Sequence, residues 1–144
     1  VHTCCGHLLG SRVAAVILDY MVQHDLVRNS RQQGARLFQG LNEIQERRAS
    51  VGDVRGLGLM CGVEFVKNKA AREPFPPELK TAERVMDACM ERGLIVFPGH
   101  GTIDGTAGDH LLIGPPLVIA PNQVDDLLTI LDEAVGAVEK EIRP

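Results

Sequence analysis

The sequence predicts an α+β fold, in which a small, mainly antiparallel sheet carries helices on one face. The first supporting observation is that four segments repeat apolar residues at helical spacing. The second is that three other segments have the apolar pattern of strands. The third is their order along the chain, which is helix, helix, strand, helix, strand, strand, helix.

The four helical segments differ in their amphipathicity. Residues 8–22 are apolar on nearly every side, which predicts a buried helix that is too short to span a bilayer. Residues 26–48 have one apolar stripe and one charged face. A third helix is expected from residue 76 to about residue 92, because Gly93 is a natural C-terminal stop. The last helix is expected to begin at Pro121.

The strand segments lie between the helices. Residues 50–53 are predicted to form a turn, and the alternating pattern of residues 55–66 predicts one strand. Glycines gather on one face of that strand, which indicates that another part of the chain packs very close there. Residues 94–97 and 111–113 are predicted as short strands, joined by a glycine-rich loop over residues 98–109.

Composition excludes several classes of protein. The chain has 144 residues, enough for one domain with a modest core. A net charge of −4 and an aromatic content of 3% argue against a nucleic-acid partner. We see neither a signal peptide nor a membrane-spanning segment. Four cysteines, two of them adjacent, favour a reducing compartment, and we expect a cytoplasmic protein.

Residues 1–25 differ in composition from the rest of the chain. A helix that is apolar on all sides needs cover on all sides, and this chain has little left to supply it. We therefore interpret residues 1–25 as a piece of another domain or as a dimer surface. Residues 26–144 are interpreted as a small α+β domain.

Candidate ligand groups occur at the start of the chain. His2, Cys4, Cys5 and His7 are potential metal ligands, but their spacing is too tight for one tetrahedral ion, so we expect no metal site. Thr3 could instead offer a hydroxyl to an anion at the start of the first helix, together with a backbone N–H near Gly6.

The glycine-rich loop contains a second set of candidates. Two stretches, residues 99–101 and 105–108, could cradle a phosphate, but the loop leads into a strand rather than a helix, which favours a long hairpin loop or an active-site lid. The polar residues of the loop are His100, Asp104, Asp109 and His110. They could form an acid–base group, or they could be a solvated surface. Arg55 could meet a carboxylate or form a surface ion pair.

The sequence offers few residues that could carry out covalent catalysis. The sequence shows no recognisable nucleophilic triad. Its four lysines, Lys67, Lys69, Lys80 and Lys140, lie in polar loops or on helices, without an apolar pocket to lower the pKa for Schiff-base chemistry. We therefore predict no catalytic residue in this chain.

Three landmarks nevertheless resemble one enzyme family. Residues 2–9, His-Thr-Cys-Cys-Gly-His-Leu-Leu, resemble a Thr-Tyr-Ser-Gly-His-Pro-Leu segment. Residues 55–64 resemble a strand with Arg-Gly-x-Gly-Leu and a final Gly-(Val/Ile)-Glu. Residues 93–96 and 101–117 resemble a closing hairpin that ends in Pro-Pro. These segments are similar to the C-terminal part of class III aminotransferases, fold-type I enzymes that use pyridoxal phosphate.

The resemblance implies a function and a set of contacts. Such enzymes transfer an amino group from an amine or amino acid to a keto acid or aldehyde, and the cofactor serves as the electron sink of the reaction. Thr3 would contact the cofactor phosphate in the neighbouring subunit's site of a homodimer. Phe97 and Gly101 would lie near the substrate channel. Residues 1–25 would be the tail helix of the large cofactor-binding domain.

The resemblance also implies what this chain lacks. In the family, the Schiff-base lysine and the aspartate that pairs with the pyridine nitrogen precede the opening motif, so we expect a fragment that is inactive alone. Leu112 and Phe97 occupy positions where relatives carry a carboxylate-binding arginine, which suggests an apolar channel for an amine or ω-amino acid. Cys4-Cys5, Leu8 and Arg12 depart from the usual opening motif.

Two alternatives remain. A decarboxylase or an aminomutase of the same fold would show the same landmarks. A stand-alone interaction or regulatory module with an α+β layer would explain the absence of catalytic residues without any missing domain.

Overall fold

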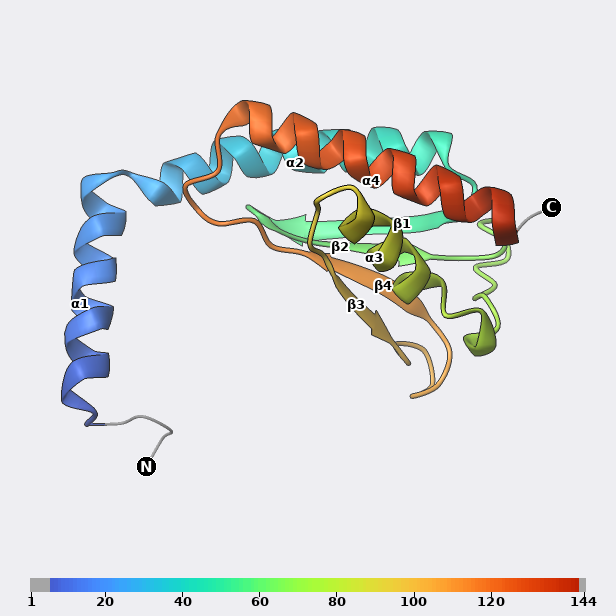
Figure 1. The fold of residues 1–144 in the computed structure, drawn as a ribbon, viewed down its shortest axis with the longest axis horizontal. Helices are drawn as coiled ribbons and strands as arrows, with labels where there is room; N and C mark the ends of the chain where they lie inside the picture. The colour runs from blue at the N-terminus through green and yellow to red at the C-terminus, as the bar shows by residue number, and fades with distance from the viewer. Residues whose placement is uncertain (1–5, 143–144) are drawn as a thin grey trace.

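The computed structural model describes residues 6–142 (Figure 1). Its elements in chain order are α1 (Leu8–Gln23), α2 (Leu26–Arg47), β1 (Val51–Leu57), β2 (Met60–Phe65), the 3-10 turn η1 (Pro77–Leu79), α3 (Thr81–Glu91), β3 (Phe97–His100), β4 (Asp109–Ile113) and α4 (Pro121–Ile142). All four predicted helical segments are present.

The part of the chain that the structure describes contains one four-stranded antiparallel sheet, in the order β1-β2-β4-β3. Alternate residues of β2 and β4 are buried on one face of it, against apolar residues of α2, α3 and α4. Figure 1 shows α2 and α4 running side by side along the sheet. The predicted α+β fold with helices on one face is therefore confirmed.

The segment predicted as one strand is a hairpin. β1 begins at Val51, inside the predicted turn, and the chain reverses between Leu57 and Met60. Gly58 has φ = 58°, the left-handed conformation that glycine adopts readily. The alternating pattern continues through the short turn, so periodicity alone does not reveal the reversal. Leu57 pairs with Met60 beside this turn and is 89% exposed.

Close packing at the glycines occurs where the hairpin turns. Gly34 of α2 lies against Gly58, and a Cβ atom on Gly34 would be 2.3 Å from the carbonyl carbon of Gly58. Gly62 lies in the open by comparison, because the atoms nearest to an added Cβ are carbonyl oxygens at 3.9 Å. The prediction of a close approach thus holds at Gly58 and also at Gly56, where an added Cβ would lie 2.4 Å from the carbonyl oxygen of Met60, but not at Gly62.

The strand predicted over residues 94–97 begins later, at Phe97. The reason is the end of α3, where Gly93 has φ = 86° and the N–H of Leu94 donates to the carbonyl of Cys89 over 2.9 Å. This is the hydrogen bonding of a helix C-terminus with glycine in the left-handed region. Residues 94–96 follow this cap and connect the helix to β3, whose pairing with β4 begins at Phe97.

Helix α1 differs from the other helices, because none of its residues is buried. The described residues do not bury this helix, as expected from how little cover the rest of the chain can supply. Its burial against another domain or a dimer partner stays a prediction. Figure 1 shows α1 projecting away from the sheet, joined to it only through α2. Within residues 6–142, no helix combines the length and the apolar character needed to cross a membrane.

Candidate functional site

The sheet face opposite the helices carries four of the candidate residues, Phe97, Leu112, His110 and Arg55. On this face Phe97 of β3 is paired with Leu112 of β4, which is paired in turn with Gly62 of β2. Phe97 is 68% exposed and Leu112 is 46% exposed. The two positions at which the resemblance suggests a carboxylate-binding arginine are thus direct neighbours, and both are apolar.

Polar residues form the next row of the same face. His110 of β4 is paired with Glu64 of β2, which is paired with Asp53 of β1. The imidazole of His110 covers Gly99 of β3 so closely that an added Cβ on Gly99 would be 2.3 Å from Cε1 of His110. The face is therefore apolar at one end and polar at the other.

Gly101 begins the loop between β3 and β4, and its backbone explains why a glycine is present. Gly101 has φ = 74°, and an added Cβ would lie 2.8 Å from the carbonyl oxygen of Gly105. The N–H of Gly105 donates to the carbonyl of Gly101 over 3.0 Å, and the N–H of Ile103 donates to that of Ala107 over 3.0 Å. Backbone hydrogen bonds thus hold the loop in one shape.

Asp104 stabilises the tip of this loop. Its Oδ1 accepts hydrogen bonds from the N–H groups of Thr106 at 2.9 Å and Ala107 at 2.7 Å. Hydrogen bonds from Ala107 and then Thr106 lower the pKa of Asp104, because they favour the ionised carboxylate. Asp104 is therefore a turn residue that stays charged.

Asp109 connects the loop to α3. It is buried at the start of β4, and its Oδ2 accepts a hydrogen bond from the N–H of Thr81, the first residue of α3, over 3.2 Å. The preceding residue, Lys80, makes no side-chain cap, so Asp109 acts as the cap from another element. Burial is the main reason that the pKa of Asp109 is raised.

His100 lies opposite Asp109 in the hairpin, and its Nδ1 is 3.4 Å from Oε1 of Glu83 on α3. The structure thus brings His100 and Asp109 together at the base of the loop. It does not bring together all four residues of the possible acid–base group. Asp104 accepts hydrogen bonds from its own loop. His110 faces away from Asp109, because successive residues of a strand point to opposite faces of the sheet.

Arg55 forms ion pairs on the open face of the sheet. Its Nη1 lies 2.8 Å from Oε2 of Glu64 and also contacts Asp53. The hydrogen bonds that Arg55 donates, first to Glu64 and then to Asp53, raise the pKa of Arg55. The surface ion pair is therefore the outcome in this structure. The pairing depends on the β1–β2 hairpin, which the sequence interpretation missed, although Gly58 at the centre of the alternating run was the available signal.

The predicted residues at the start of the chain lie mostly outside the described part. Thr3, His2, Cys4 and Cys5 fall there, so the phosphate contact stays a prediction. His7 caps α1, because its Nδ1 accepts a hydrogen bond from the N–H of Gly10 over 2.9 Å. In residues 6–142 no three His, Cys, Asp or Glu side chains are grouped so that they could hold a metal ion.

The lysines are all exposed. Lys67 forms an ion pair with Glu73 at 2.8 Å, and Lys69 donates to the carbonyl of Gln45. None has the apolar surroundings that make a lysine amine a nucleophile at neutral pH. The described lysines therefore provide ion pairs and hydrogen bonds at the surface.

Solved structures with the same arrangement are transaminases. A transaminase from the marine bacterium Virgibacillus superposes with a TM-score of 0.88 at 33% identity, covering 99% of this chain and 31% of the solved one. An amine transaminase of an uncultivated Pseudomonas species, solved in its PLP-bound internal aldimine form, gives a TM-score of 0.76 at 29% identity, covering 87% of this chain and 26% of that one.

Sequence comparison agrees with the structural comparison. The aminotransferase YodT of Bacillus subtilis is 35% identical over 142 residues, which is 99% of this chain and 32% of YodT. The aminotransferase C1771.03c of Schizosaccharomyces pombe is 37% identical over 130 residues, 90% of this chain and 28% of that protein. The chain thus spans about a third of the length of such relatives. The family model for Aminotransferase class-III matches residues 2–135, and the chain belongs to the class III aminotransferase family.

Proposed function

We propose that this chain is the C-terminal part of a pyridoxal-phosphate-dependent aminotransferase, which transfers an amino group from an amine or amino acid to a keto acid or aldehyde. The observation that carries the proposal is the exposure of α1. Leu8 is 89% exposed and Val22 is 81% exposed, at opposite ends of a helix with no buried residue. Such a surface needs cover that only further protein can give.

Residues outside this chain would cover that helix. The relatives are about three times as long as the chain, and their remaining length is available to form a large domain. We assign residues 1–25 to the end of that domain and residues 26–144 to the small domain. In a homodimer, Thr3 would reach the cofactor phosphate of the neighbouring subunit.

The chain's own residues do not fit the covalent role in cofactor binding. Pyridoxal phosphate supplies an electron sink and is held as a Schiff base by a lysine amine. The four lysines here are exposed and lack an apolar pocket, so the attachment site belongs to residues outside this chain.

The role of this chain is to shape one wall of the substrate channel. Phe97 and Leu112 would present an apolar surface to the amine or keto acid, and the loop from Gly101 would form its rim. Neither residue can pair with a carboxylate, so an amine or ω-amino acid donor, which has no carboxylate near the reacting carbon, suits this wall best. A cytoplasmic location agrees with the free, buried thiols of Cys61 and Cys89.

The test compares the 144-residue chain with the longer protein that contains it. After addition of pyridoxal phosphate and borohydride reduction, mass spectrometry locates any pyridoxyl-lysine. We expect one stoichiometric adduct in the longer protein, outside these residues, together with an aldimine absorbance band and transfer of an amino group. The isolated chain should show neither the band nor a single stoichiometric adduct.

A matched control is the longer protein in which the chain's four lysines are replaced by arginine. It should keep the aldimine band and the activity, because none of these lysines holds the cofactor. Loss of the band in this variant, with its fold preserved, would overturn the proposal. So would a stoichiometric adduct on one lysine of the isolated chain.

A further inference from the structure

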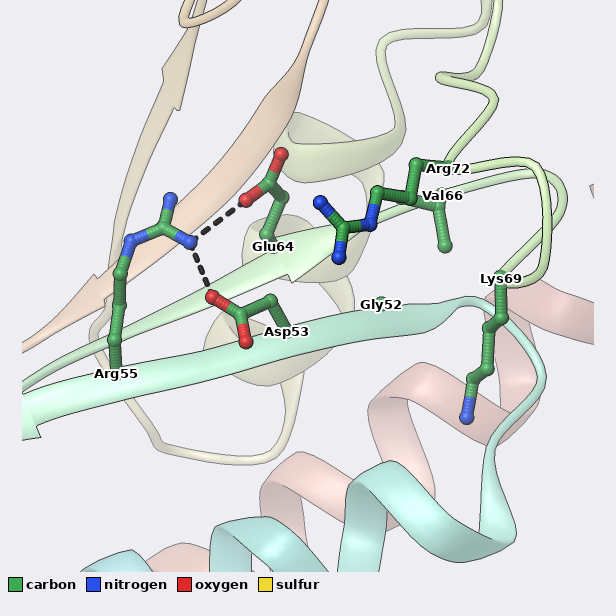
Figure 2. Close-up of a pocket in the computed structure, with 7 residues that line it drawn as sticks. All are labelled: Gly52, Asp53, Arg55, Glu64, Val66, Lys69 and Arg72. Carbon is green, nitrogen blue, oxygen red and sulfur yellow. Dashed lines mark hydrogen bonds and ion pairs between the residues drawn. The ribbon is translucent and has the colours of Figure 1, made fainter.

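A polar cavity lies at the far end of the open sheet face, beside the β1–β2 hairpin (Figure 2). Its volume is about 370 Å³. It is lined by Gly52, Asp53, Arg55, Glu64, Val66, Lys69 and Arg72. Figure 2 shows the guanidinium group of Arg72 pointing back over β2 toward Glu64. Neither the family resemblance nor the proposed reaction uses this cavity.

A tightly built turn presents Arg72 to the cavity. Asn68 and Glu73 form a β-bridge, and the N–H of Ala71 donates to Oδ1 of Asn68 over 3.0 Å. Arg72 itself has φ = 51°, a left-handed conformation that is uncommon for a residue with a side chain. Strained backbone of this kind persists only where the surrounding structure holds it, and it is frequent at ligand sites. The turn therefore fixes the point at which the Arg72 side chain leaves the backbone beside the cavity.

The three cations that line the cavity differ in their partners. Arg55 is shared between Glu64 and Asp53, and Lys69 donates to the carbonyl of Gln45. By contrast, the guanidinium of Arg72 has no hydrogen bond or ion pair with any residue among those the structure describes. Arg72 is thus the cation that is available to a ligand.

Charge and shape define the ligand class. Three cationic and two anionic side chains line the cavity, which leaves a single positive charge. A monoanion would neutralise it, whereas a phosphate dianion would add repulsion against the carboxylates of Asp53 and Glu64. A planar guanidinium donates two parallel hydrogen bonds to a planar carboxylate. We propose that this cavity binds one carboxylate group through Arg72.

The carboxylate has two sources, a small molecule or an acidic side chain of protein. The test titrates the 144-residue chain with sodium acetate at constant ionic strength, and in a second arm with a capped tripeptide that has a central aspartate. Amide chemical shifts of Gly52, Glu64 and Arg72 report on the cavity. We expect saturable shifts at millimolar ligand in at least one arm, and the tighter arm identifies the source.

Two variants separate specific binding from general salt effects. Arg72→Gln should weaken binding by about fivefold or more, as expected for the loss of one charge-assisted hydrogen bond. Arg31→Gln, which removes an exposed guanidinium on α2, should leave binding unchanged, and unchanged amide shifts in α3 and α4 show that both variants are folded. Absent or non-saturable shifts, equal effects of the two variants, or tighter binding of inorganic phosphate than of acetate would overturn the proposal. This outcome is independent of the aminotransferase assignment.

Discussion

Gly34 of α2 and Gly58 of the β1–β2 turn pack backbone against backbone, closer than any residue with a side chain would permit at position 34. The contact brings the helix onto the turn of the hairpin that carries Arg55. It therefore fixes the hairpin against the helical layer at the end opposite the loop between Asn68 and Glu73.

Gly34→Ala should destabilise the fold by roughly 1–3 kcal/mol, because the added methyl group collides with rigid backbone and outweighs the gain in helix propensity. Gly40→Ala in the same helix is the control, since its Cβ would meet the mobile end of Leu128. Urea unfolding monitored by circular dichroism measures both. Equal midpoints for the two variants would contradict the rigid contact at Gly58.

Asp109→Ala should cost about 1–2 kcal/mol, the usual effect of losing a helix N-cap. Asp109→Asn keeps an oxygen that can accept the hydrogen bond from Thr81 and should cost less. The comparison is by chemical denaturation of the wild type and both variants. A larger loss in the asparagine variant than in the alanine variant would show that Asp109 does not act as a cap.

The raised pKa of Asp109 also predicts a pH dependence. Because burial raises the folded-state pKa above that of the unfolded chain, the protonated form favours folding. The contribution of Asp109 to the free energy of unfolding is full below the unfolded pKa and declines as the pH rises through the folded pKa. The wild type should therefore gain stability relative to Asp109→Asn as the solution is acidified. A difference that is constant from neutral to acidic pH would contradict this.

Cys89 should be almost inert toward alkylation in the folded protein. Burial raises its pKa to about 11, and it has no exposed surface. At pH 8 this reduces the thiolate fraction on the order of 100-fold relative to an ordinary cysteine. Iodoacetamide labelling followed by mass spectrometry should modify Cys89 only when urea unfolds the chain. Rapid native labelling would show that α3 opens easily.

Removal of residues 1–25 should leave the remaining domain as stable as before. No residue of α1 is buried, so its loss changes the free energy of unfolding by about 0.5 kcal/mol or less. The shortened chain should also self-associate less, because an exposed apolar surface is gone. Denaturation and size-exclusion chromatography test both points. Loss of cooperative unfolding would place the boundary between the two parts elsewhere.

The sequence predicted the helices better than the strands, for a physical reason. Helical spacing over many residues is a strong signal, as at Leu37, Leu41 and Ile44, which are all buried. The apolar alternation of residues 57–65 runs unbroken through the two-residue turn, although the pairing of Leu57 with Met60 places Leu57 on the open face, so the turn at Gly58 was hidden. Once the hairpin was missed, the ion pairs of Arg55 with Asp53 and Glu64 could not be predicted either.

The candidate site, like the fold, was predictable from the sequence only in part. The expected residues Phe97 and Gly101 are described, but only the sheet register reveals that Phe97 and Leu112 are neighbours, since 14 other residues separate them in the chain. Arg72 was not predicted at all, because nothing in its neighbourhood distinguishes it from a solvated loop arginine. Its place beside the cavity depends on a left-handed backbone conformation that the sequence does not signal.

The loop between β3 and β4 separates the residues that keep its shape from those that meet its surroundings. Gly101, Asp104 and Gly105 set the backbone, whereas the side chains of Thr102, Ile103 and Thr106 are exposed. Exchange of these exposed side chains would therefore change the surface that the loop presents and leave its backbone hydrogen bonds in place.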